Sequence, residues 1–279
     1  MSIPVTYLPD PELADCILSY AIAAVAKPTT ESFLCPPLGL SGFFIQHRSS
    51  TGIATAQVEG NDILVSKAVA IGQFTSPLTG NYSGKIKTLL IFFHPLGMYQ
   101  LFGCDMHKLT NTSINLRLLL GEEKGQYLLK RLEETDDYLS LIQILNDFFK
   151  AQKTCSNDTR EVKRLLDFIH FHHGNVSIKE IEEHCYVHRK SIERHFQFQI
   201  GLSPKIYASI YRFKWLMNYL QQHPKTAWLQ LSCLSGYYDQ SHMVRYFKEY
   251  LKVPPNQLET LNIELVNYLL SRSTNLVKY

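Results

Sequence analysis

Residues 227–255, AWLQLSCLSGYYDQSHMVRYFKEYLKVPP, have the pattern of two short helices separated by a turn. Gly236 provides the turn, and Asp239 can cap the second helix. The second helix repeats apolar residues at intervals of three and four on one face, and its other face is polar and basic. The apolar residues are Met243, Phe247, Tyr250 and Leu251. This pattern indicates a helix-turn-helix unit whose second helix reads DNA.

The same pattern occurs about fifty residues earlier, so this half of the chain is an internal repeat. Arg194-His195-Phe196 aligns with Arg245-Tyr246-Phe247 at an offset of 51. A capping box at Ser177-Ile178-Lys179-Glu180 begins the first helix of the earlier copy. The inner face of its second helix carries Ile192, Phe196 and Ile200. A long helix over Pro204–Gln222 joins the copies, so two recognition helices on one rigid body can enter successive major grooves about 34 Å apart.

The residues Gly236-Tyr237-x-Asp239-x-Ser241-His242-x-x-Arg245-x-Phe247-Lys248 resemble the second helix-turn-helix of the AraC/XylS family of transcription regulators. The resemblance extends over residues 158–258. It implies an all-α DNA-binding domain, residues 158–260, in which a long helix joins two helix-turn-helix units. It also implies double-stranded DNA as a partner and, for an activator, contact with RNA polymerase.

The first copy departs from the family's pattern at three positions. Glu182 stands where a small Ala is usual, Tyr186 stands where Gly is usual in the turn, and His188 replaces the usual Ser cap. His is a weaker helix cap than Ser. We therefore expect the second helix-turn-helix unit to bind DNA more strongly than the first.

Family resemblance and helix geometry together predict which side chains contact DNA. Arg can bind guanine through two hydrogen bonds, Gln can bind adenine, and Val can meet the thymine methyl group. Contacts to phosphates position the protein without reading sequence. The expected base-contacting residues are Lys190, Glu193, Arg194, Gln240, Ser241, Val244 and Arg245. The expected phosphate-contacting residues are Arg189, Lys205 and Lys248. As an alternative, Arg194 and Arg245 bond to neighbouring helices.

Residues 1–152 have a different character, with short apolar runs between Pro and Gly turns. Strands are predicted at 39–46, 62–66 and 86–93 and within 65–74, whereas the Ala-rich segment 13–26 is predicted to be helical. The segments Gly72-Gln73-x-Thr75-x-Pro77 and Phe93-x-Pro95-x-Gly97 look like a cupin-like sensor domain found ahead of some AraC-type regulators. The predicted fold is therefore α+β: a β-rich cupin-like barrel with following helices, then the all-α domain.

Helices are predicted within 95–102, 116–120, 126–132 and 137–150, and a polar linker follows at 150–159. The last of these helices carries an apolar stripe of Leu141, Ile144, Leu145 and Phe148. This stripe either packs on its own barrel or forms the seam of a homodimer. Residues 261–279 form a C-terminal tail with a helical pattern and no predicted role.

Control of the regulator is expected to come through the N-terminal domain, either from a small-molecule effector or from dimerisation. The effector-binding residues are unknown. Five aromatic residues either line an apolar ligand pocket or form an ordinary core. They are Phe43, Phe44, Phe74, Tyr82 and Phe93.

Composition limits the classes of protein that fit the chain. Its 279 residues, 45% of them apolar, are enough for two folded domains. Residues 1–157 carry a net charge of −2 and residues 158–279 a net charge of +5, so the second part is the candidate for a polyanionic partner. The six Cys form no CxxC pair, which fits a reducing cytosol. Since no signal peptide pattern or membrane-length apolar run occurs, we expect a cytoplasmic protein without a membrane partner.

No sequence motif predicts catalysis, a metal or a cofactor. A GxSxG elbow, a P-loop and an HExxH motif are all missing. His170, His172 and His173 precede Gly174 at a predicted helix end, where the helix dipole favours them without any metal. The main prediction is a DNA-binding regulator that is not an enzyme. One alternative is a barrel that dimerises and binds no ligand. The other is an enzyme such as an alkyl-transfer repair protein, which needs an activated Cys and usually a set of zinc-binding thiolates, and the sequence places no such set beside Cys35.

Overall fold

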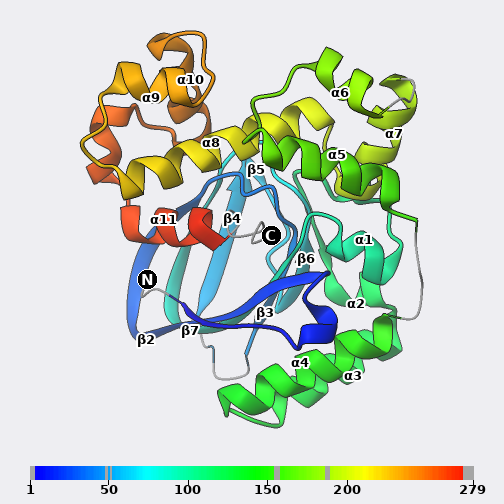
Figure 1. The fold of residues 1–279 in the computed structure, drawn as a ribbon. Coiled ribbons are helices and arrows are strands. Elements are labelled where there is room, and N and C mark those ends of the chain that lie inside the picture. The colour runs from blue at the N-terminus through cyan, green and yellow to red at the C-terminus, as the bar shows by residue number, and fades with distance from the viewer. Residues whose placement is uncertain (1–3, 48–49, 51, 154–157, 186–188, 273–279) are drawn as a thin grey trace.

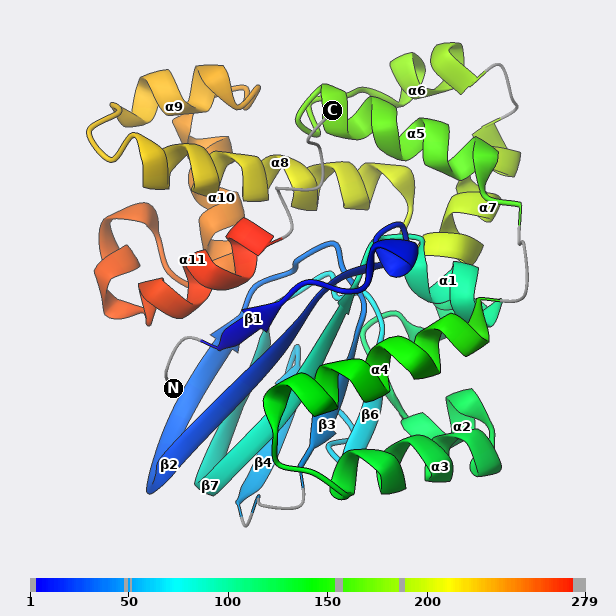
Figure 2. The same cartoon turned by 60° about the horizontal axis from the view of Figure 1, so that its bottom comes forward.

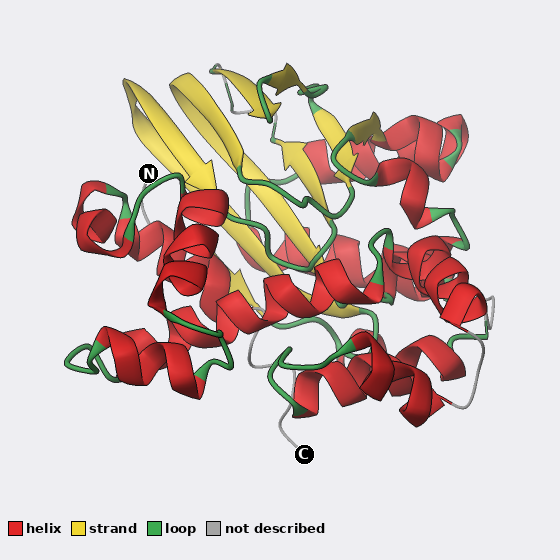
Figure 3. Cartoon of the chain, turned by 90° about the horizontal axis from the view of Figure 1, so that it is seen from above, coloured by secondary structure: helices red, strands yellow, loops and turns green. Residues whose placement is uncertain are grey.

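The structure is a computed structural model that describes residues 4–47, 50, 52–153, 158–185 and 189–272. A β-sheet and four helices come first along the chain, and a group of helices follows. The second group lies across one end of the sheet (Figure 1). The view from above shows most helices gathered beside the strands (Figure 3). The α+β prediction is confirmed.

The N-terminal sheet has eight strands among the described residues, and all of its strand pairs are antiparallel. Its order is β1-β2-β7-β3-β6-β8, while β4 pairs with β7 and β5. The two long central strands are β2 (Ile17–Cys35) and β7 (Leu78–Phe93). The shorter strands are β1 (Val5–Tyr7), β3 (Gly42–Gln46), β4 (Ile53–Val58), β5 (Asn61–Asp62), β6 (Ala68–Ile71) and β8 (Ser113–Asn115).

The helix predicted for residues 13–26 is wrong, because most of that segment belongs to β2. Alanine favours helix locally, but β2 pairs with β7 from Ile17 to Cys35. Consecutive residues from Ser19 to Ala23 are buried, so both faces of the strand are covered. Such a strand lacks the alternation that identifies a strand with one solvent face.

The strand predicted at 62–66 is also largely wrong. Only Asn61–Asp62 form a strand there. Ile63, Leu64 and Val65 instead form a loop that contributes to an apolar cavity. The apolar run is irregular and only partly buried, since Leu64 is 47% exposed.

The helix α4 (Tyr138–Gln152) lies across the sheet (Figure 2). Its N-cap, Asp137, accepts a hydrogen bond of 2.8 Å from the backbone N–H of Ser140. Leu141, Leu145 and Phe148 are buried in one cluster with strand residues of the sheet. The stripe on α4 therefore packs on its own domain. The other N-terminal helices are α1 (Gly97–Phe102), α2 (Leu116–Leu120) and α3 (Glu122–Glu133), with 3₁₀ turns η1 (Pro11–Leu13) and η2 (Met106–Leu109).

The C-terminal half contains the two predicted helix-turn-helix units. The first unit is α6 (Ile178–Cys185) and α7 (Arg189–Ile200), and the second is α9 (Trp228–Leu234) and α10 (Gln240–Leu251). The helices α7 and α10 have the same length of 12 residues and begin 51 positions apart. Around them lie α5 (Arg160–Phe171), α8 (Pro204–Gln222), η3 (Pro255–Thr260) and α11 (Ile263–Arg272).

Side-chain caps fix where these helices begin. The Ser177–Glu180 box has both of its hydrogen bonds, at 2.7 and 3.2 Å. The Ser203 side chain accepts from Ile206 N, and the Asp239 carboxylate accepts from His242 N at 2.7 Å. Each cap satisfies a backbone N–H that the helix itself leaves unpaired.

The predicted inner faces of α7 and α10 are buried, from Ile192 to Ile200 and from Met243 to Leu251. Three apolar residues at helical spacing are nevertheless exposed. Ile206 lies in the first turn of α8 and is 40% exposed, while Leu229 and Leu234, near the two ends of α9, are 62% and 48% exposed. Spacing alone does not reveal that the ends of these helices extend beyond their neighbours.

The turn of the second unit is held in a close contact. Gly236 has a φ of +69°, and a Cβ atom there would lie 2.3 Å from side-chain atoms of Asn175. The Arg212 guanidinium lies 4.6 Å from the centre of the Tyr237 ring and donates to the Gly236 carbonyl at 3.4 Å. The turn is therefore fixed to α8 and to the segment that follows α5.

We expect Gly236→Ala to destabilise the protein by more than the cost of its backbone conformation. A left-handed residue costs about 1–2 kcal/mol for any L-amino acid with a Cβ. The contact with Asn175 adds to that cost. Urea unfolding of the full chain measures the loss.

Gly60→Ala is the matched control, since Gly60 also has a positive φ, +79°, and a Cβ there would meet nothing within 4 Å. Gly60→Ala should show the backbone cost alone. Equal losses in the two variants would show that the Asn175 contact contributes nothing.

Candidate DNA interface and effector pocket

The helices α7 and α10 carry most of the residues predicted to contact DNA, and Lys205 lies in the first turn of α8. Glu193 and Val244 are half-buried, and the side chain of Arg189 lies outside the described residues, as do residues 186–188 with the departures Tyr186 and His188. The other predicted contacts are exposed: Lys190, Arg194, Lys205, Gln240, Ser241, Arg245 and Lys248.

Arg194 and Arg245 are oriented towards solvent. Among the described residues, neither guanidinium has a hydrogen bond or an ion pair. Their alternative role as bonds to neighbouring helices therefore has no support in this structure. His242, in contrast, is enclosed: its ring lies 5.5 Å from that of Tyr237 and 5.4 Å from that of Tyr246.

The C-terminal end of α7 is attached to the N-terminal domain. Phe198 packs edge-on against Tyr99 of α1, with ring centres 5.6 Å apart. The Thr110 hydroxyl donates to the Gly201 carbonyl just after α7. His195 Nδ1 lies 2.9 Å from a Glu161 carboxylate oxygen on α5. The helix α7 is thus held from both domains, while Lys190 and Arg194 on its outer face stay exposed.

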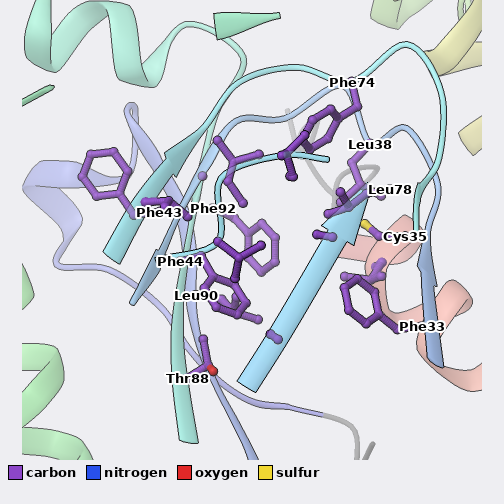
Figure 4. A pocket seen from close by; sticks show the side chains of 18 of the residues that line it. Phe33, Cys35, Leu38, Phe43, Phe44, Phe74, Leu78, Thr88, Leu90 and Phe92 are labelled. Atoms are coloured by element: carbon purple, nitrogen blue, oxygen red, sulfur yellow. The ribbon is translucent and has the colours of Figure 1, made fainter. Parts of the chain in front are cut away.

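An apolar cavity of about 180 Å³ lies between the strands of the N-terminal domain and α11. Strands β2, β3, β4, β6 and β7 contribute to its wall together with the loop at residues 63–65. Figure 4 shows Phe44, Leu90 and Phe92 beside one another on the wall. A dry apolar cavity with few polar groups is typical of a binding site for a small molecule.

Of the five aromatic residues predicted to line a pocket or to form an ordinary core, three line the cavity and two belong mainly to the core. Phe44, Phe74 and Tyr82 line the cavity. Phe43 borders it, but its ring points away from it (Figure 4) and packs edge-on against Phe93, with ring centres 4.9 Å apart. Phe93 belongs to the core beneath α4.

The helix α11 completes the cavity wall from the other end of the chain. Leu265 and Leu269 line the cavity, while Val266 and Leu270 are buried in the cluster that also holds α8 and α10. Tyr268 Oη lies 2.7 Å from the Thr6 hydroxyl of the segment around β1. The helical pattern of residues 261–279 was noticed in the sequence, but nothing in one sequence indicates which cavity a helix closes.

A buried lysine connects α8 to the loop at residues 36–41. Lys214 Nζ donates to the Leu38 carbonyl at 2.5 Å and lies 5.3 Å from the centre of the Tyr211 ring. Burial lowers the pKa of this ammonium well below its usual value. Leu38 and Leu40 of the loop also line the cavity. Sequence reasoning missed this contact, although a Lys next to the apolar stripe of α8 is a signal that could have found it.

No group of three or more His, Cys, Asp or Glu side chains among the described residues could hold a metal ion. In the predicted His cluster, His170 Nε2 lies 2.8 Å from Tyr207 Oη, and the His173 ring stacks on Trp215 at 4.9 Å. Burial raises the pKa of the Cys35 thiol to about 12, which disfavours a nucleophilic thiolate. No helix in the described part of the chain is both long and apolar enough to span a membrane.

We expect the Lys214→Met variant to lose a pH dependence of stability that the parent protein has. A lysine whose pKa is lowered by folding binds more protons when unfolded, so the free energy of unfolding rises with pH up to the pKa of the unfolded lysine, near 10.4. The parent should therefore gain stability relative to the variant between pH 7 and pH 10, by up to about 1.4 kcal/mol per pH unit. Urea unfolding at several pH values measures this difference.

Two neighbours of Lys214 do not interfere in that range, since burial lowers the pKa of His170 to about 3 and raises that of Tyr207 well above its usual value. Lys205→Met, an exposed substitution on the same helix, is the control and should leave the pH profile unchanged. If the free energies of unfolding of the parent and of Lys214→Met changed in parallel with pH, the pKa of Lys214 would not be lowered by folding.

Comparison with known proteins gives one matching family model. Residues 5–115 match a domain of unknown function, DUF6597. No curated protein matches the chain.

The solved structures that it is similar to include an apo variant of ToxT from Vibrio cholerae strain SCE256, with 13% identity, coverage of 87% of this chain and 97% of that chain, and a TM-score of 0.47. Unsaturated fatty acid-bound wild-type ToxT from the same strain has 13% identity, coverage of 88% and 96%, and a TM-score of 0.47. The AraC-like transcriptional activator CuxR has 14% identity, coverage of 78% and 88%, and a TM-score of 0.33.

The chain's own features define its class. It carries the helix-turn-helix motif that resembles the AraC/XylS family, two such units on one long helix, and a β-rich domain before them. These features define a chain of two parts, a β-rich domain followed by an all-α part with two helix-turn-helix units.

Proposed function

We propose that this chain is a sequence-specific DNA-binding transcription regulator that a small molecule controls through the N-terminal cavity. The observation that carries the proposal is the pair of helix-turn-helix units with exposed polar and basic residues on α7 and α10. In such units the second helix enters the major groove. We further expect contact with RNA polymerase, homodimerisation and a cytoplasmic location from the resemblance to the family.

The spacing of the units suits duplex DNA. The 19 residues of α8 extend over about 28 Å at 1.5 Å per residue. The units lie at the two ends of α8 (Figure 1), so their separation is close to the 34 Å between successive major grooves on one face of DNA. We propose Lys190, Glu193 and Arg194 as base contacts of the first unit and Gln240, Ser241, Val244 and Arg245 as those of the second. Arg189, Lys205 and Lys248 are the proposed phosphate contacts.

Arg245→Ala should weaken binding to a duplex selected from a random pool by about 1–3 kcal/mol and relax the preference at one base pair. The reason is that Arg can bind guanine through two hydrogen bonds, which no other base reproduces. Titrations of the selected duplex and of a random duplex measure this difference. Affinity for both should fall steeply with salt, since phosphate contacts release counterions.

Lys248→Ala is the comparison within the interface and should weaken both duplexes alike. Arg131→Ala, on α3 in the N-terminal domain, is the control for loss of an exposed Arg and should change neither affinity. An equal loss on both duplexes for Arg245→Ala would remove Arg245 from the base contacts. Binding that does not respond to salt would contradict the DNA-binding role as a whole.

The cavity supports control by a small molecule because both domains form its wall. Leu265 and Leu269 of α11 face the cavity, and α11 packs on α8, which joins the two readers. The loop at residues 36–41 borders the cavity and receives the hydrogen bond from Lys214 of α8. A ligand that moves either wall therefore acts directly on the helix that sets the spacing of the readers.

The alternatives are weaker on specific grounds. A barrel that only dimerises needs no interior space, whereas this domain has an open volume of about 180 Å³. An alkyl-transfer enzyme needs a reactive thiolate, which burial of Cys35 opposes.

Ala56→Leu should abolish the effect of an effector while keeping DNA binding. Ala56 is buried in β4 and lines the cavity, so a larger side chain occupies space that a ligand requires. The measurement is selection of duplexes from a random pool with and without cell extract, for the parent and the variant. Gln57→Leu, at the adjacent exposed position of the same strand, should keep the parent's response. A full response in Ala56→Leu would show that the effector binds elsewhere.

A further inference from the structure

Thr88 is a polar residue in an otherwise apolar part of the cavity wall. It lies on β7, opposite Gln46 of β3, and its side chain is fully buried. Leu90 and Phe92 follow it on the same face of the strand, because side chains alternate along β-strands. Figure 4 shows the Thr88 oxygen at one end of the row formed by these residues.

The Thr88 hydroxyl has no hydrogen-bond partner among the described residues. Buried hydroxyls are normally paired, because leaving one unpaired costs free energy. Rotation cannot readily provide a partner, since a β-branched side chain in a strand has restricted χ1 and β7 is paired on both edges by β2 and β3. The cavity wall therefore contains one fixed, unpaired hydrogen-bonding group at this position.

Ser41 is the second buried hydroxyl in the wall without a partner among the described residues. Its backbone carbonyl accepts from Phe93 N, so it lies five residues along β7 from Thr88, about 17 Å at 3.4 Å per residue. Ser41 precedes β3 and its hydroxyl rotates more freely, so it is the less fixed of the two. A molecule the size of one benzene ring cannot reach both.

The lack of charged side chains among the described wall residues argues against an ionic ligand. None of the described residues that line the cavity is charged. The lysine nearest to the loop at residues 36–41, Lys214, is directed to the Leu38 carbonyl and is absent from the wall. Burying an unpaired carboxylate or ammonium group in such a site is strongly unfavourable.

The volume limits the size of the ligand. An apolar cavity of about 150 Å³ holds a benzene molecule, and this cavity has about 180 Å³. Phe33, Phe44, Phe74 and Phe92 in the wall suit a flat ring, because aromatic rings pack favourably edge-on or offset.

We propose that the cavity binds a neutral, mostly apolar molecule about the size of a substituted benzene ring, and that Thr88 Oγ1 forms a hydrogen bond with its single hydroxyl group. The inference concerns the same cavity as the proposed effector control. Its test needs no DNA, so a failure of the DNA-binding proposal does not affect the result.

The test compares three probes of similar shape by calorimetric titration of the full chain: 4-methylphenol, 1,4-dimethylbenzene and 4-methylbenzoate. We expect 4-methylphenol to bind most tightly. Thr88→Val keeps the shape of the side chain and removes the hydroxyl, so it should weaken 4-methylphenol about 3- to 10-fold. The same variant should leave 1,4-dimethylbenzene unchanged or slightly tighter. The benzoate should bind at least about 100-fold more weakly than the phenol.

Ser41→Ala is the matched control, since it removes the other unpaired hydroxyl of the same wall and should leave the phenol's affinity unchanged. Thr88→Ser keeps a hydroxyl and should retain the preference for the phenol over the hydrocarbon. Equal affinities of phenol and hydrocarbon, tightest binding of the benzoate, or no binding of any probe at millimolar concentration would each overturn the proposal. A phenol affinity that falls in Ser41→Ala and not in Thr88→Val would move the anchor to Ser41 and overturn the role of Thr88.

Discussion

The burial of α8 on more than one face is the constraint on which the rest of the structure depends. Tyr207, Ile210, Phe213, Lys214 and Leu216 are buried along it, and they do not share one side of a helix. Around it pack α5, α7 and α11, and the loop at residues 36–41 of the N-terminal domain. A helix buried in this way cannot shift without its neighbours, so both helix-turn-helix units and the cavity depend on the position of α8.

The two helix-turn-helix units differ in the contacts that hold them in place. The second is fixed within the C-terminal half, through Gly236, Arg212 and Asn175. The first is attached to the N-terminal domain through Phe198 and Tyr99. A change in the N-terminal domain can therefore reach the first unit through α1 and the segment around η2, and the second unit through α8 and α11. This asymmetry agrees with the sequence, in which the first unit departs from the AraC/XylS pattern at three positions.

Local signals in the sequence were enough to predict the C-terminal half. Capping residues such as Ser203 and Asp239 act on the nearest turn of the chain, and the stripe from Met243 to Leu251 lies within one helix. The strand β2 could not be predicted in the same way, because its stability comes from pairing with β7 about sixty residues later. The interior of the N-terminal domain is harder still, since the cavity brings Thr88 and Leu265 together from opposite parts of the chain.

The position of α11 also affects how the protein is made. A chain is synthesised from its N-terminus at about 5–20 residues per second, and domains can fold as they emerge. The strands that surround the cavity are complete at Phe93, whereas Leu265 follows about 170 residues later, a delay on the order of ten seconds or more at these rates. Until then the nascent sheet has an apolar cavity with one wall missing. The newly made sheet is therefore the stage at which this protein is most open to ligands and to unwanted contacts.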